Sequence, residues 1–506
     1  MKHLVLSLLL LIFCNNFLLS QNLTARIKVD IERKIGGIDE NLYGNFTEHL
    51  GRCIYGGLYE PGSAKADNQG FRTDVLNATK EMGVSLVRWP GGNFASGYHW
   101  MDGIGNKANR PKRKDLAWGD TESNQVGTDE FLAWSKAAKV APYICVNLGT
   151  GSLDEARNWV EYCNAPTGLY YSDLRAANGH PEPYNVQYWG LGNEIDGPWQ
   201  MGHKNAEDYS KFALEAAKLM KWSDDKIKLI ASGSSNYGSG WTDWNRTVLN
   251  SLGGYVDYIS LHNYVGNHDK DHYKFMASTI FAENVIKITE GLIKEATLKN
   301  KIDHPIYIAF DEYNVWYRAW NEQKLEEHYN MQDALVIASY LNCFIRNAQI
   351  VKMANLAQLV NVIAPMMVTH DTLWYQTTFY PLQLFAENCK GNSIASFVEC
   401  ASYKNNDKDV PYLDVSTVYN DTTKELMINV VNRHLDKGIT TSITNQFGNL
   451  SNKAMVYEIN SPDIMDENTV SEQKVKTKEK SINVSGNSLQ YTFPAHSFTM
   501  IKIKMN

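Results

Sequence analysis

The chain has 506 residues, of which 43% are hydrophobic and 21% charged, values that are typical of a globular protein with two or three domains. Its 35 glycines and 14 prolines exclude collagen-like and disordered classes. The net charge is −7 and the basic residues form no block or stripe, so the composition argues against nucleic-acid or membrane partners. The 28 Tyr and 13 Trp suit either sugar-stacking surfaces or an aromatic core, and composition leaves both readings open.

The first 20 residues predict an export signal. Lys2 provides the positive start, and Leu4–Phe13 is an apolar stretch that only Ser7 interrupts. This stretch is too short to cross a bilayer core of about 30 Å as a helix. Cleavage after Ser20 would leave Gln21 as the new N-terminus. We therefore expect a signal peptide over residues 1–20 and a periplasmic or extracellular protein, with a buried N-terminal helix or a lipidated Cys14 as weaker alternatives.

From residue 41 onwards, apolar strands alternate with helix-like segments. The predicted strands are Asn41–Phe46, Ser85–Trp89, Pro142–Asn147, Gln187–Leu191, Lys228–Ser232, Val256–His262, Ile306–Asp311 and Ala354–Gln358. The predicted helices between them include Thr128–Lys139, Asp154–Cys163, Ala206–Met220 and Met331–Asn347. Alternation of this kind indicates a parallel sheet, and eight units favour a closed (β/α)8 TIM barrel over 41–384. An open doubly wound sheet is the alternative, although no GxGxxG turn follows the first strand.

After about residue 385, period-two alternation replaces the helical pattern. Glu425–Val431, Ala454–Ile459 and Phe498–Lys504 alternate or are rich in β-branched residues, with Asn, Asp and Gly turns between them. This predicts an antiparallel, jelly-roll-like β-sandwich over 385–506. The segment Leu23–Ile31 alternates in the same way, so we expect residues 21–40 to form a strand that joins this C-terminal sheet. The predicted fold class is thus α/β, a TIM barrel followed by a sandwich.

Six cysteines follow the predicted signal peptide: Cys53, Cys145, Cys163, Cys343, Cys389 and Cys400. Their spacing matches no metal-binding motif. Cys145 and Cys343 lie in apolar runs and are predicted core residues. Cys389 with Cys400 is the only plausible disulfide pair.

Two carboxylates, Glu194 and Glu312, each follow a predicted strand and precede aromatic residues. In a barrel, side chains at the C-terminal ends of the strands share one rim. Glu194 would follow the fourth strand and Glu312 the seventh, which face each other across the barrel mouth. A facing carboxylate pair with aromatic walls is what glycoside cleavage requires. Taken singly, either glutamate could instead support a helix N-terminus or be a surface group.

Other polar residues follow the predicted strands. Asn193 could bind a sugar hydroxyl or hold a turn, Arg88 could orient a buried carboxylate or form a structural ion pair, and His262 could position a carboxylate or be a core histidine. Three tryptophans in nearby loops could stack on sugars or simply pack: Trp118, Trp199 and Trp316. No HExxH motif and no clustered ligand set indicate a metal, so we expect no metal and no cofactor.

The motifs together resemble glycoside hydrolase family 51 α-L-arabinofuranosidases. The stretches that carry this resemblance are Gly44–Ser63 (GNFTEHLGRCIYGGLYEPGS), Arg88–Gly105 (RWPGGNFASGYHWMDGIG), Tyr188–Lys204 (YWGLGNEIDGPWQMGHK), Tyr258–Gly266 (YISLHNYVG), Phe310–Tyr317 (FDEYNVWY) and Leu356–Pro365 (LAQLVNVIAP). They occur in the order of the family and are distributed over residues 44–365. The resemblance implies a barrel with a β-sandwich, which is the architecture that the strand pattern predicts.

The resemblance also implies roles for individual residues. Glu194 would be the general acid/base and Glu312 the nucleophile of a retaining double displacement, with carboxyl groups about 5 to 5.5 Å apart. Residues that would bind the arabinofuranose or orient the nucleophile are Glu48, Arg88, Asn93, Asn193, Tyr264, Trp316 and Gln358, to which we add His262. Trp118 would border the site for the rest of the substrate. Members of the family are often hexamers and need no metal.

The expected function is exo-acting removal of terminal arabinofuranosyl residues from arabinan- or arabinoxylan-type saccharides. A β-xylosidase or β-glucanase activity on the same scaffold is the second hypothesis. A sugar-binding protein without catalysis is the third, although the presence of both carboxylates disfavours it. The segment between Trp316 and Met331 is shorter than in many family members, which leaves the preference for polymer or oligomer open.

Overall fold

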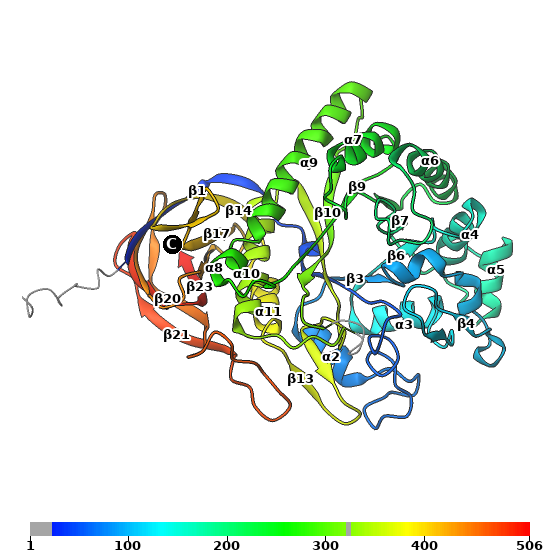
Figure 1. Cartoon of the computed structure of the whole chain (residues 1–506), viewed down its shortest axis with the longest axis horizontal. Coiled ribbons are helices and arrows are strands. Elements are labelled where there is room, and N and C mark those ends of the chain that lie inside the picture. Colours follow the sequence, from blue (N-terminus) through cyan, green and yellow to red (C-terminus); the bar gives the residue numbers. More distant parts are fainter. Residues whose placement is uncertain (1–22, 320–324) are drawn as a thin grey trace, which may run out of the picture.

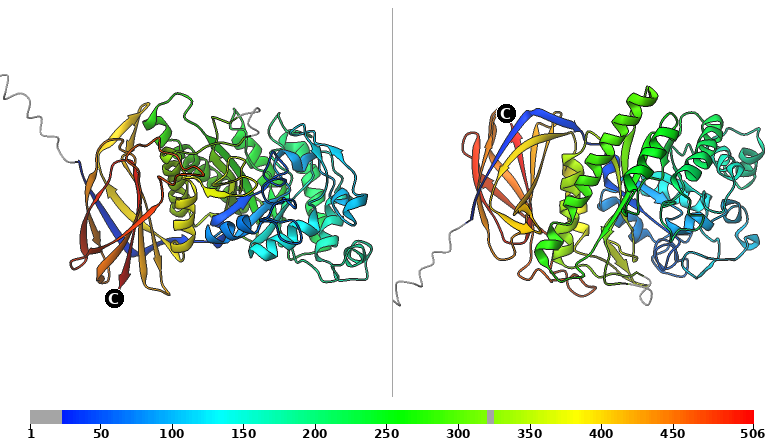
Figure 2. Two further views of the ribbon diagram at one scale, coloured as in Figure 1. Left: turned by 90° about the horizontal axis from the view of Figure 1, so that it is seen from below. Right: turned by 45° about the horizontal axis from the view of Figure 1, so that its top comes forward.

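The computed structural model describes residues 23–319 and 325–506, and it divides into a barrel and a mostly β lobe that lie side by side (Figures 1 and 2). Eight parallel strands close the barrel in chain order. They are β2 (Gly44–Phe46), β3 (Leu86–Trp89), β6 (Ala141–Val146), β7 (Tyr188–Leu191), β8 (Lys228–Ala231), β9 (Tyr258–Val265), β10 (Tyr307–Val315) and β11 (Val351–Ala357). The predicted closed barrel is therefore confirmed, and the open-sheet alternative is wrong.

The first predicted strand is shorter than expected. Asn41 to Tyr43 belong to the 3-10 helix η1 (Glu40–Tyr43), so β2 begins only at Gly44. The side chain of Asp39 caps this turn by accepting a hydrogen bond of 3.0 Å from the Asn41 amide. This local bond competes with strand pairing, and the period-two pattern of the sequence does not reveal it.

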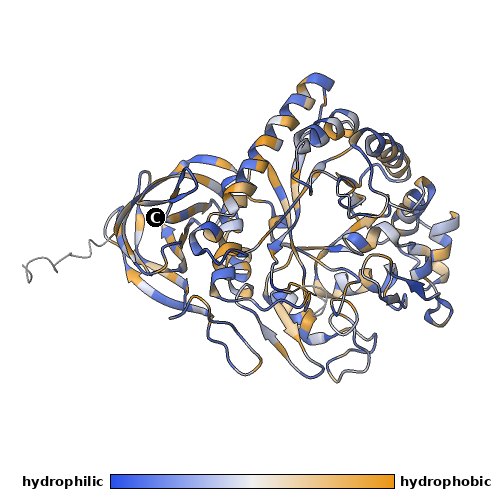
Figure 3. Ribbon diagram, viewed as in Figure 1, coloured by the Kyte–Doolittle hydropathy of each residue, from blue (hydrophilic) through white to orange (hydrophobic). Residues whose placement is uncertain are grey.

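Helices surround the barrel strands. Their bounds are α2 (Thr73–Glu81), α3 (Thr128–Ala138), α4 (Leu153–Asn164), α5 (Tyr170–Ala177), α6 (Ala206–Ser223), α7 (Trp241–Leu252), α8 (His272–Met276), α9 (Thr279–Asn300), α10 (Met331–Arg346) and α11 (Phe379–Asn388). Side chains define several N-termini: Ser152 accepts from the Glu155 amide at 3.1 Å, and Asn205 accepts from the Asp208 amide at 2.8 Å. Apolar and polar residues alternate along these helices, as the colouring of Figure 3 shows.

Short additional elements lie in the connections of the barrel. The 3-10 helices η2 (Asn93–Gly97), η3 (Trp100–Gly103) and η4 (Lys107–Asn109) follow β3. Next comes the two-stranded ribbon of β4 (Arg113–Lys114) and β5 (Thr121–Glu122), whose turn carries Trp118. A second ribbon, β12 (Met366–Val368) with β13 (Leu373–Tyr375), follows β11.

The second lobe, called the sandwich below, is built on one continuous nine-stranded sheet and has its own hydrophobic core. Its strands in spatial order are β21 (Thr477–Asn483), β20 (Leu450–Ile459), β23 (Ser497–Met505), β18 (Glu425–Asn432), β17 (Leu413–Asn420), β14 (Asn392–Glu399), β1 (Leu23–Gly37), β19 (Ile439–Asn445) and β22 (Ser488–Phe493). β1 pairs antiparallel with β14 but parallel with β19, so the expectation of a purely antiparallel sheet is wrong for that pair. A separate hairpin, β15 (Ser402–Asn405) with β16 (Lys408–Pro411), extends from this lobe.

Helix α10 joins the two lobes. All of its residues from Met331 to Ile345 are buried, because the barrel covers one side and the sheet the other. At its C-terminal end, Arg346 donates through Nη1 to Asp414 Oδ1 of β17 at 2.9 Å. Within the same strand, Ser416 Oγ donates to Asn342 Oδ1 at 2.6 Å. An apolar helix with a polar patch at one end therefore holds the sheet against the barrel.

Other expectations from the sequence have different outcomes. The predicted disulfide is wrong: Cys389 and Cys400 are both free thiols, and the buried Cys389 sulfur accepts from Asn429 Nδ2 at 3.3 Å. The predicted signal peptide lies outside the described residues, as does the middle of the short segment after Trp316. Within 23–319 and 325–506, none of the helices combines the length and apolar composition that a membrane span requires.

Candidate active site

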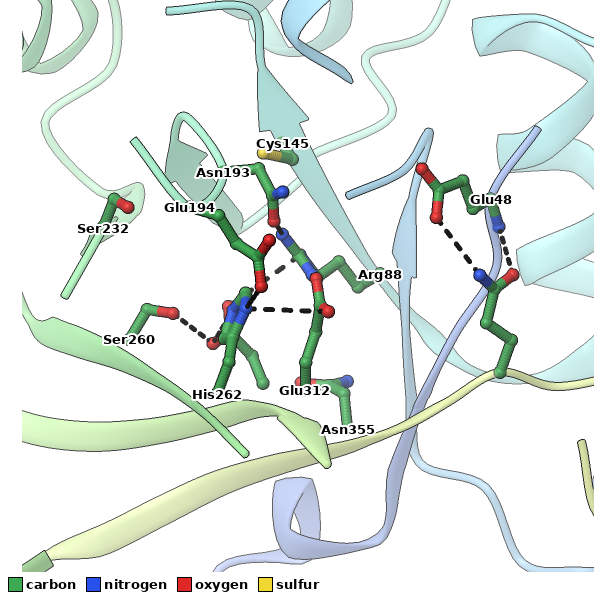
Figure 4. Close-up of polar contacts among 12 residues, drawn as sticks. Glu48, Arg88, Cys145, Asn193, Glu194, Ser232, Ser260, His262, Glu312 and Asn355 are labelled. Atoms are coloured by element: carbon green, nitrogen blue, oxygen red, sulfur yellow. Dashed lines mark hydrogen bonds and ion pairs between the residues drawn. The ribbon is translucent and has the colours of Figure 1, made fainter. Parts of the chain in front are cut away.

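The two proposed catalytic glutamates meet at the C-terminal rim of the barrel. Glu194 follows β7, the fourth strand, and Glu312 lies in β10, the seventh. Both approach one imidazole: His262 Nδ1 is 2.9 Å from Glu194 Oε1 and 3.6 Å from Glu312 Oε2 (Figure 4). A carboxylate oxygen of each glutamate lies within 4.8 Å of the other. Glu194 has a left-handed backbone (φ 46°), a strained conformation for a residue with a side chain, and such strain clusters at functional sites.

Glu312 is buried and bound at both carboxylate oxygens. Arg88 Nη1 donates to Oε1 at 2.5 Å, and the Tyr264 hydroxyl donates to Oε2 at 2.7 Å. Hydrogen bonds from a cation and a hydroxyl favour the charged form of a carboxyl group. The arrangement holds both oxygens of the Glu312 carboxyl group at fixed positions.

Arg88 organises the floor of the site. It is almost fully buried, and its Nη2 donates to Asn193 Oδ1 at 2.5 Å. Burial opposes the charged guanidinium, but Glu312 and Asp311 outweigh this effect and raise the pKa of Arg88. Gly92 leaves room for this cluster: a Cβ atom there would lie 3.2 Å from Glu312 Oε1. Any larger residue at position 92 would therefore press on the Glu312 carboxylate.

Asp311 is a buried anion beneath the pair that the sequence did not single out as a site residue. It accepts from the Tyr143 hydroxyl at 2.8 Å and from Ser260 Oγ. Burial would raise its pKa, but Arg88 and His262 outweigh burial and lower it to about 2. Asp311 ends a predicted strand beside Glu312, but its contacts with Arg88, His262 and Ser260 emerge only when the barrel closes.

His262 bridges the carboxylates. Its Nδ1 faces Glu194, and its Nε2 lies 3.3 Å from Asp311 Oδ1, an ion-pair distance. Burial opposes the charge, but Glu312 together with Asp311 and Glu194 raises the pKa of His262 to about 10. At neutral pH the ring is therefore a cation that holds Glu194 beside Glu312.

Glu48 forms the opposite wall with residues from three other segments. Its Oε1 accepts from the Phe94 amide at 2.9 Å and from Trp118 Nε1 at 3.0 Å. Its Oε2 accepts from Gln358 Nε2 at 3.1 Å. Burial is the main reason why the pKa of Glu48 rises to about 8, and the nearby Glu312 charge adds to it. Residues far apart in the sequence thus hold one carboxyl group at the pocket surface.

These groups line a cavity of about 610 Å³. Nine of the predicted site residues line it: Glu48, Asn93, Trp118, Glu194, His262, Tyr264, Glu312, Trp316 and Gln358. The other two, Arg88 and Asn193, lie behind Glu312, and the buried Asn193 Nδ2 has no hydrogen-bond partner among the described residues. Trp316 packs edge to face with Tyr264, with ring centroids 5.7 Å apart. The structure therefore brings the whole predicted set together.

Sequence reasoning missed Ser235 and Tyr237, which also line the cavity. They lie in the Gly/Ser-rich connection after β8, which resembles an ordinary loop, and the only signal was its place at the rim. Trp199 was singled out only as a loop tryptophan. Its indole Nε1 donates to Glu194 Oε2 at 2.6 Å, so this half-exposed ring touches the proposed acid/base directly.

Glu194, His262 and Glu312 have a spacing that could hold a metal ion, because one ligand atom from each lies within 4.8 Å of the others. The raised pKa of His262 argues for a different use. A metal-binding imidazole nitrogen must be unprotonated, whereas the surrounding carboxylates keep His262 cationic. Both Glu312 oxygens also already have donors. The arrangement suits proton transfer better than metal binding, and the expectation of a metal-free site stays a prediction.

Comparison with known proteins gives consistent matches. Residues 78–280 match the family described as the α-L-arabinofuranosidase 1 domain, and residues 311–497 match the α-L-arabinofuranosidase C-terminal domain. An intracellular exo-α-(1→5)-L-arabinofuranosidase 1 from Bacillus subtilis is 44% identical over 427 residues, which is 82% of this chain and 85% of that protein. A probable α-L-arabinofuranosidase C from Aspergillus clavatus is 40% identical over 96% of this chain and 98% of its own length.

Solved structures agree with these matches. An arabinose complex of the α-L-arabinofuranosidase from Thermotoga maritima superposes with a TM-score of 0.87 at 38% identity, covering 95% of this chain and 99% of that one. A family 51 α-L-arabinofuranosidase from Bifidobacterium longum gives a TM-score of 0.90 at 34% identity, covering 95% of this chain and all of that one.

A TIM barrel whose rim presents two carboxylates within 4.8 Å, in a pocket lined by aromatic residues, defines a glycoside hydrolase. The matches extend over almost the whole chain and include both lobes. The chain belongs to the family 51 α-L-arabinofuranosidases.

Proposed function

We propose that the protein is a retaining, exo-acting α-L-arabinofuranosidase that removes terminal arabinofuranosyl residues from arabinan- or arabinoxylan-type saccharides. The approach of the Glu194 and Glu312 oxygens to within 4.8 Å carries this proposal. Retaining enzymes place their two carboxyl groups about 5 to 5.5 Å apart, whereas inverting enzymes need roughly 6.5 to 9.5 Å to admit a water molecule. The exo mode is supported by the Bacillus subtilis relative, which is named an exo-acting enzyme.

In the first step, a Glu312 oxygen forms a bond to the anomeric carbon while the glycosidic C–O bond breaks. Glu194 gives its proton to the departing oxygen and becomes a carboxylate. In the second step, Glu194 takes a proton from water, and the water oxygen attacks the anomeric carbon. The bond to Glu312 breaks as the bond to water forms, which releases arabinose, returns Glu312 to a carboxylate and leaves the proton on Glu194.

The surroundings of each carboxyl group support these roles. Arg88 and Tyr264 each donate to one Glu312 oxygen and so orient the nucleophile. Glu194 keeps a partly exposed side chain, 12% accessible, so water can reach it in the second step. Asn193 Nδ2 lies beside Gly92 and Glu312 and has no hydrogen-bond partner among the described residues, so we propose that it donates to a sugar hydroxyl. Hydrogen bonds that strengthen as charge develops on the sugar lower the barrier.

The remaining predicted residues form the sugar-binding walls. We propose that Glu48, Asn93, Gln358 and Trp118 hold one side of the terminal arabinofuranose, because they line the cavity opposite Glu194. Trp316 and Tyr264 supply an aromatic corner on which a sugar ring can pack. The Trp118 indole donates to Glu48, so it belongs to the wall of the terminal-sugar pocket more than to the site for the rest of the substrate.

A panel of aryl glycosides tests the activity. We expect cleavage of an aryl α-L-arabinofuranoside, with little or no cleavage of the matching β-xyloside and β-glucoside. Cleavage of only the latter two would support the second hypothesis of a β-xylosidase or β-glucanase. Methanolysis should give a methyl arabinofuranoside of retained anomeric configuration, and an inverted product would contradict the double displacement. Complete inactivity with measurable arabinose binding would favour a sugar-binding protein.

We further propose export through residues 1–20 and assembly as a hexamer. The N-terminal pattern of Lys2 and Leu4–Phe13 supports export, although the Bacillus subtilis relative is named intracellular. N-terminal sequencing of the protein from the native host decides this, with Gln21 as the expected first residue. Light scattering of the purified enzyme tests the hexamer. We also propose two domains: a barrel over 41–384 and a sandwich over 385–506, which residues 21–40 join as a strand.

A further inference from the structure

A second cavity, of about 650 Å³, lies beside the catalytic pocket. The end of β9 and the connection after it form one wall, and α8 with the start of α9 forms another. The third wall is the β15–β16 hairpin of the sandwich, so both lobes contribute to this cavity. Figure 1 shows α8 and α9 on the side of the barrel that faces the sandwich.

The two cavities share a wall. Tyr264 lines the catalytic pocket, and the next residue of β9, Val265, lines the second cavity. Tyr237 of the catalytic pocket packs edge to face on Phe281 of the second cavity, with ring centroids 5.1 Å apart. The Tyr237–Phe281 pair therefore lies on the border between the two cavities.

The shared wall lies on the side of the proton donor. Ser235, close to Tyr237 in the chain, donates through its amide and hydroxyl to Asp196, at 2.8 and 2.6 Å. Asp196 is two residues after Glu194, so the loop of Tyr237 is held next to the acid/base. In a glycosidase the general acid faces the leaving group, because it protonates the oxygen of the bond that breaks. The second cavity is thus on the leaving-group side of the substrate.

The lining of the second cavity suits a neutral, hydroxyl-rich ligand. Four amide side chains line it: Asn267, Asn284, Asn405 and Asn406. Asp269 and Lys274 pair with each other, so they present no net charge that would select an anion. The Phe281 ring remains 44% exposed at the wall. Amide hydrogen-bonding groups around an exposed aromatic face are the features with which proteins bind sugars.

We propose that this cavity binds the saccharide chain beyond the scissile bond, so that the sandwich hairpin contributes directly to the recognition of oligomeric and polymeric substrates. The inference rests on the proposed function, because the position of Glu194 as proton donor sets the direction of the substrate. It predicts that long substrates bind more tightly than short ones. It also predicts that this difference in affinity depends on residues distant from the catalytic pair.

The test compares two substrates in three variants. Phe281→Ala removes the aromatic wall, and Asn406→Gly removes an amide from the hairpin while keeping a residue that tolerates the left-handed backbone there (φ 53°). Leu298→Ala, at the other end of α9 and 82% exposed, is the matched control. The substrates are 4-nitrophenyl α-L-arabinofuranoside, which has no sugar beyond the scissile bond, and linear α-1,5-arabinopentaose.

We expect Phe281→Ala and Asn406→Gly to raise KM for the pentaose roughly fivefold, a modest effect in line with the loss of one aromatic or amide contact, and to leave the aryl glycoside unchanged. Leu298→Ala should match the parent on both substrates. Unchanged pentaose kinetics in both variants would overturn the proposal. The proposal would also be overturned if Phe281→Ala alone lost activity, and lost it equally on both substrates. That result would show that Phe281 only holds Tyr237 in place.

Binding separates this inference from the proposed function. A Glu312→Gln enzyme, titrated by calorimetry with arabinose and with the pentaose, should bind the pentaose more tightly, and Phe281→Ala in that background should abolish the gain. Equal affinity for arabinose and pentaose would overturn the second site even if the enzyme cleaves arabinofuranosides. A parent that cleaves no arabinofuranoside but binds the pentaose in this way would instead overturn only the proposed function.

Discussion

Glu312 shows how single contacts set the chemistry of the site. Its two oxygens accept from Arg88 and Tyr264, and Arg88 is itself fixed by Asn193. Each of these partners was a candidate on sequence grounds. The cationic His262 between Glu312 and Glu194 adds a link that spacing in the sequence could not show.

Exchanging either carboxylate should separate the two catalytic roles. We expect Glu312→Gln to lose activity on every substrate, because no nucleophile remains. Glu194→Ala should lose roughly 10² to 10⁴-fold on substrates with poor leaving groups, the usual contribution of a general acid, and much less in the first step on dinitrophenyl glycosides. Azide should restore turnover of the dinitrophenyl substrate by Glu194→Ala but not by Glu312→Gln. Azide rescue of neither variant, or of Glu312→Gln alone, would contradict the assignment.

Glu48 should make stability depend on pH. Burial raises its pKa from 4.5 to about 8 in the folded protein, so between these values the native state keeps a proton that the unfolded chain releases. The stabilising contribution is complete below pH 4.5 and is lost as the pH rises to about 8. Glu48→Gln cannot titrate, so its free energy of unfolding in urea should decline less over this range than that of the parent. Glu32→Gln, at an exposed position, is the control, and parallel curves for parent and Glu48→Gln would refute the prediction.

Chelation tests whether the cluster of Glu194, His262 and Glu312 uses a metal. Because the carboxylates keep His262 protonated, we expect full activity after dialysis against EDTA and no gain on adding divalent cations. Activity lost on dialysis and recovered with one added metal would instead assign these three residues as ligands.

At the scale of elements, the connection after β10 is held by a buried carboxylate. Glu327 accepts from three successive backbone amides, those of Tyr317, Arg318 and Ala319, at 3.1 to 3.3 Å. These residues directly follow Trp316, whose indole donates to the Ala319 carbonyl at 2.8 Å. One side chain therefore fixes the backbone that presents Trp316 to the pocket.

Glu327→Gln should weaken substrate binding more than turnover. A glutamine offers one accepting oxygen in place of two, which leaves at least one buried amide less well paired, at a cost of about 1 to 3 kcal/mol. We expect KM for the aryl arabinofuranoside to rise several-fold with a smaller change in kcat. The adjacent Glu326→Gln, which loses only a partly exposed pair with Arg52, should change neither. A fall in kcat alone would show that Glu327 does not act through Trp316.

At the scale of the whole molecule, the hydrophobic core of the barrel extends into the sandwich, which also has a separate core of its own. Sandwich residues Val418, Val431 and Phe498 belong to the same buried cluster as the barrel, and α10 is covered by the sheet along its length. The sandwich is therefore part of the structure that keeps the last units of the barrel, and with them the strand of Glu312, in place.

A chain that ends at residue 384 should fail to fold into a stable barrel. The truncation would expose the sheet-facing side of α10 and leave Arg346 without Asp414. We expect insoluble protein, or soluble protein without a cooperative thermal transition, compared with the full chain by circular dichroism. A soluble, cooperative and active barrel would show that the sandwich is dispensable for folding.

The sequence alone determined the class of fold and which residues gather at the rim of the barrel. Strand and helix periods depend on which residues must be buried, so the eight strand–helix units of the barrel could be predicted. Position along a barrel strand decides which residues reach the rim, so the eleven residues that gather at the pocket could be predicted as well. Local hydrogen bonds that compete with strand formation, and the pairing of cysteines, could not be predicted. The Asp39 cap shortens the first strand, and Cys389 packs against Asn429 without a disulfide.

Only the tertiary structure decided the charge states in the site and the presence of a second cavity beside it. Burial of Glu48 and the meeting of His262 with three carboxylates depend on distances between strands that are remote in the chain. The cavity between α9 and the β15–β16 hairpin exists only because the sandwich packs on the barrel. Electrostatic shifts and shared surfaces arise from desolvation and proximity in space, and the order of residues along a chain does not carry that information.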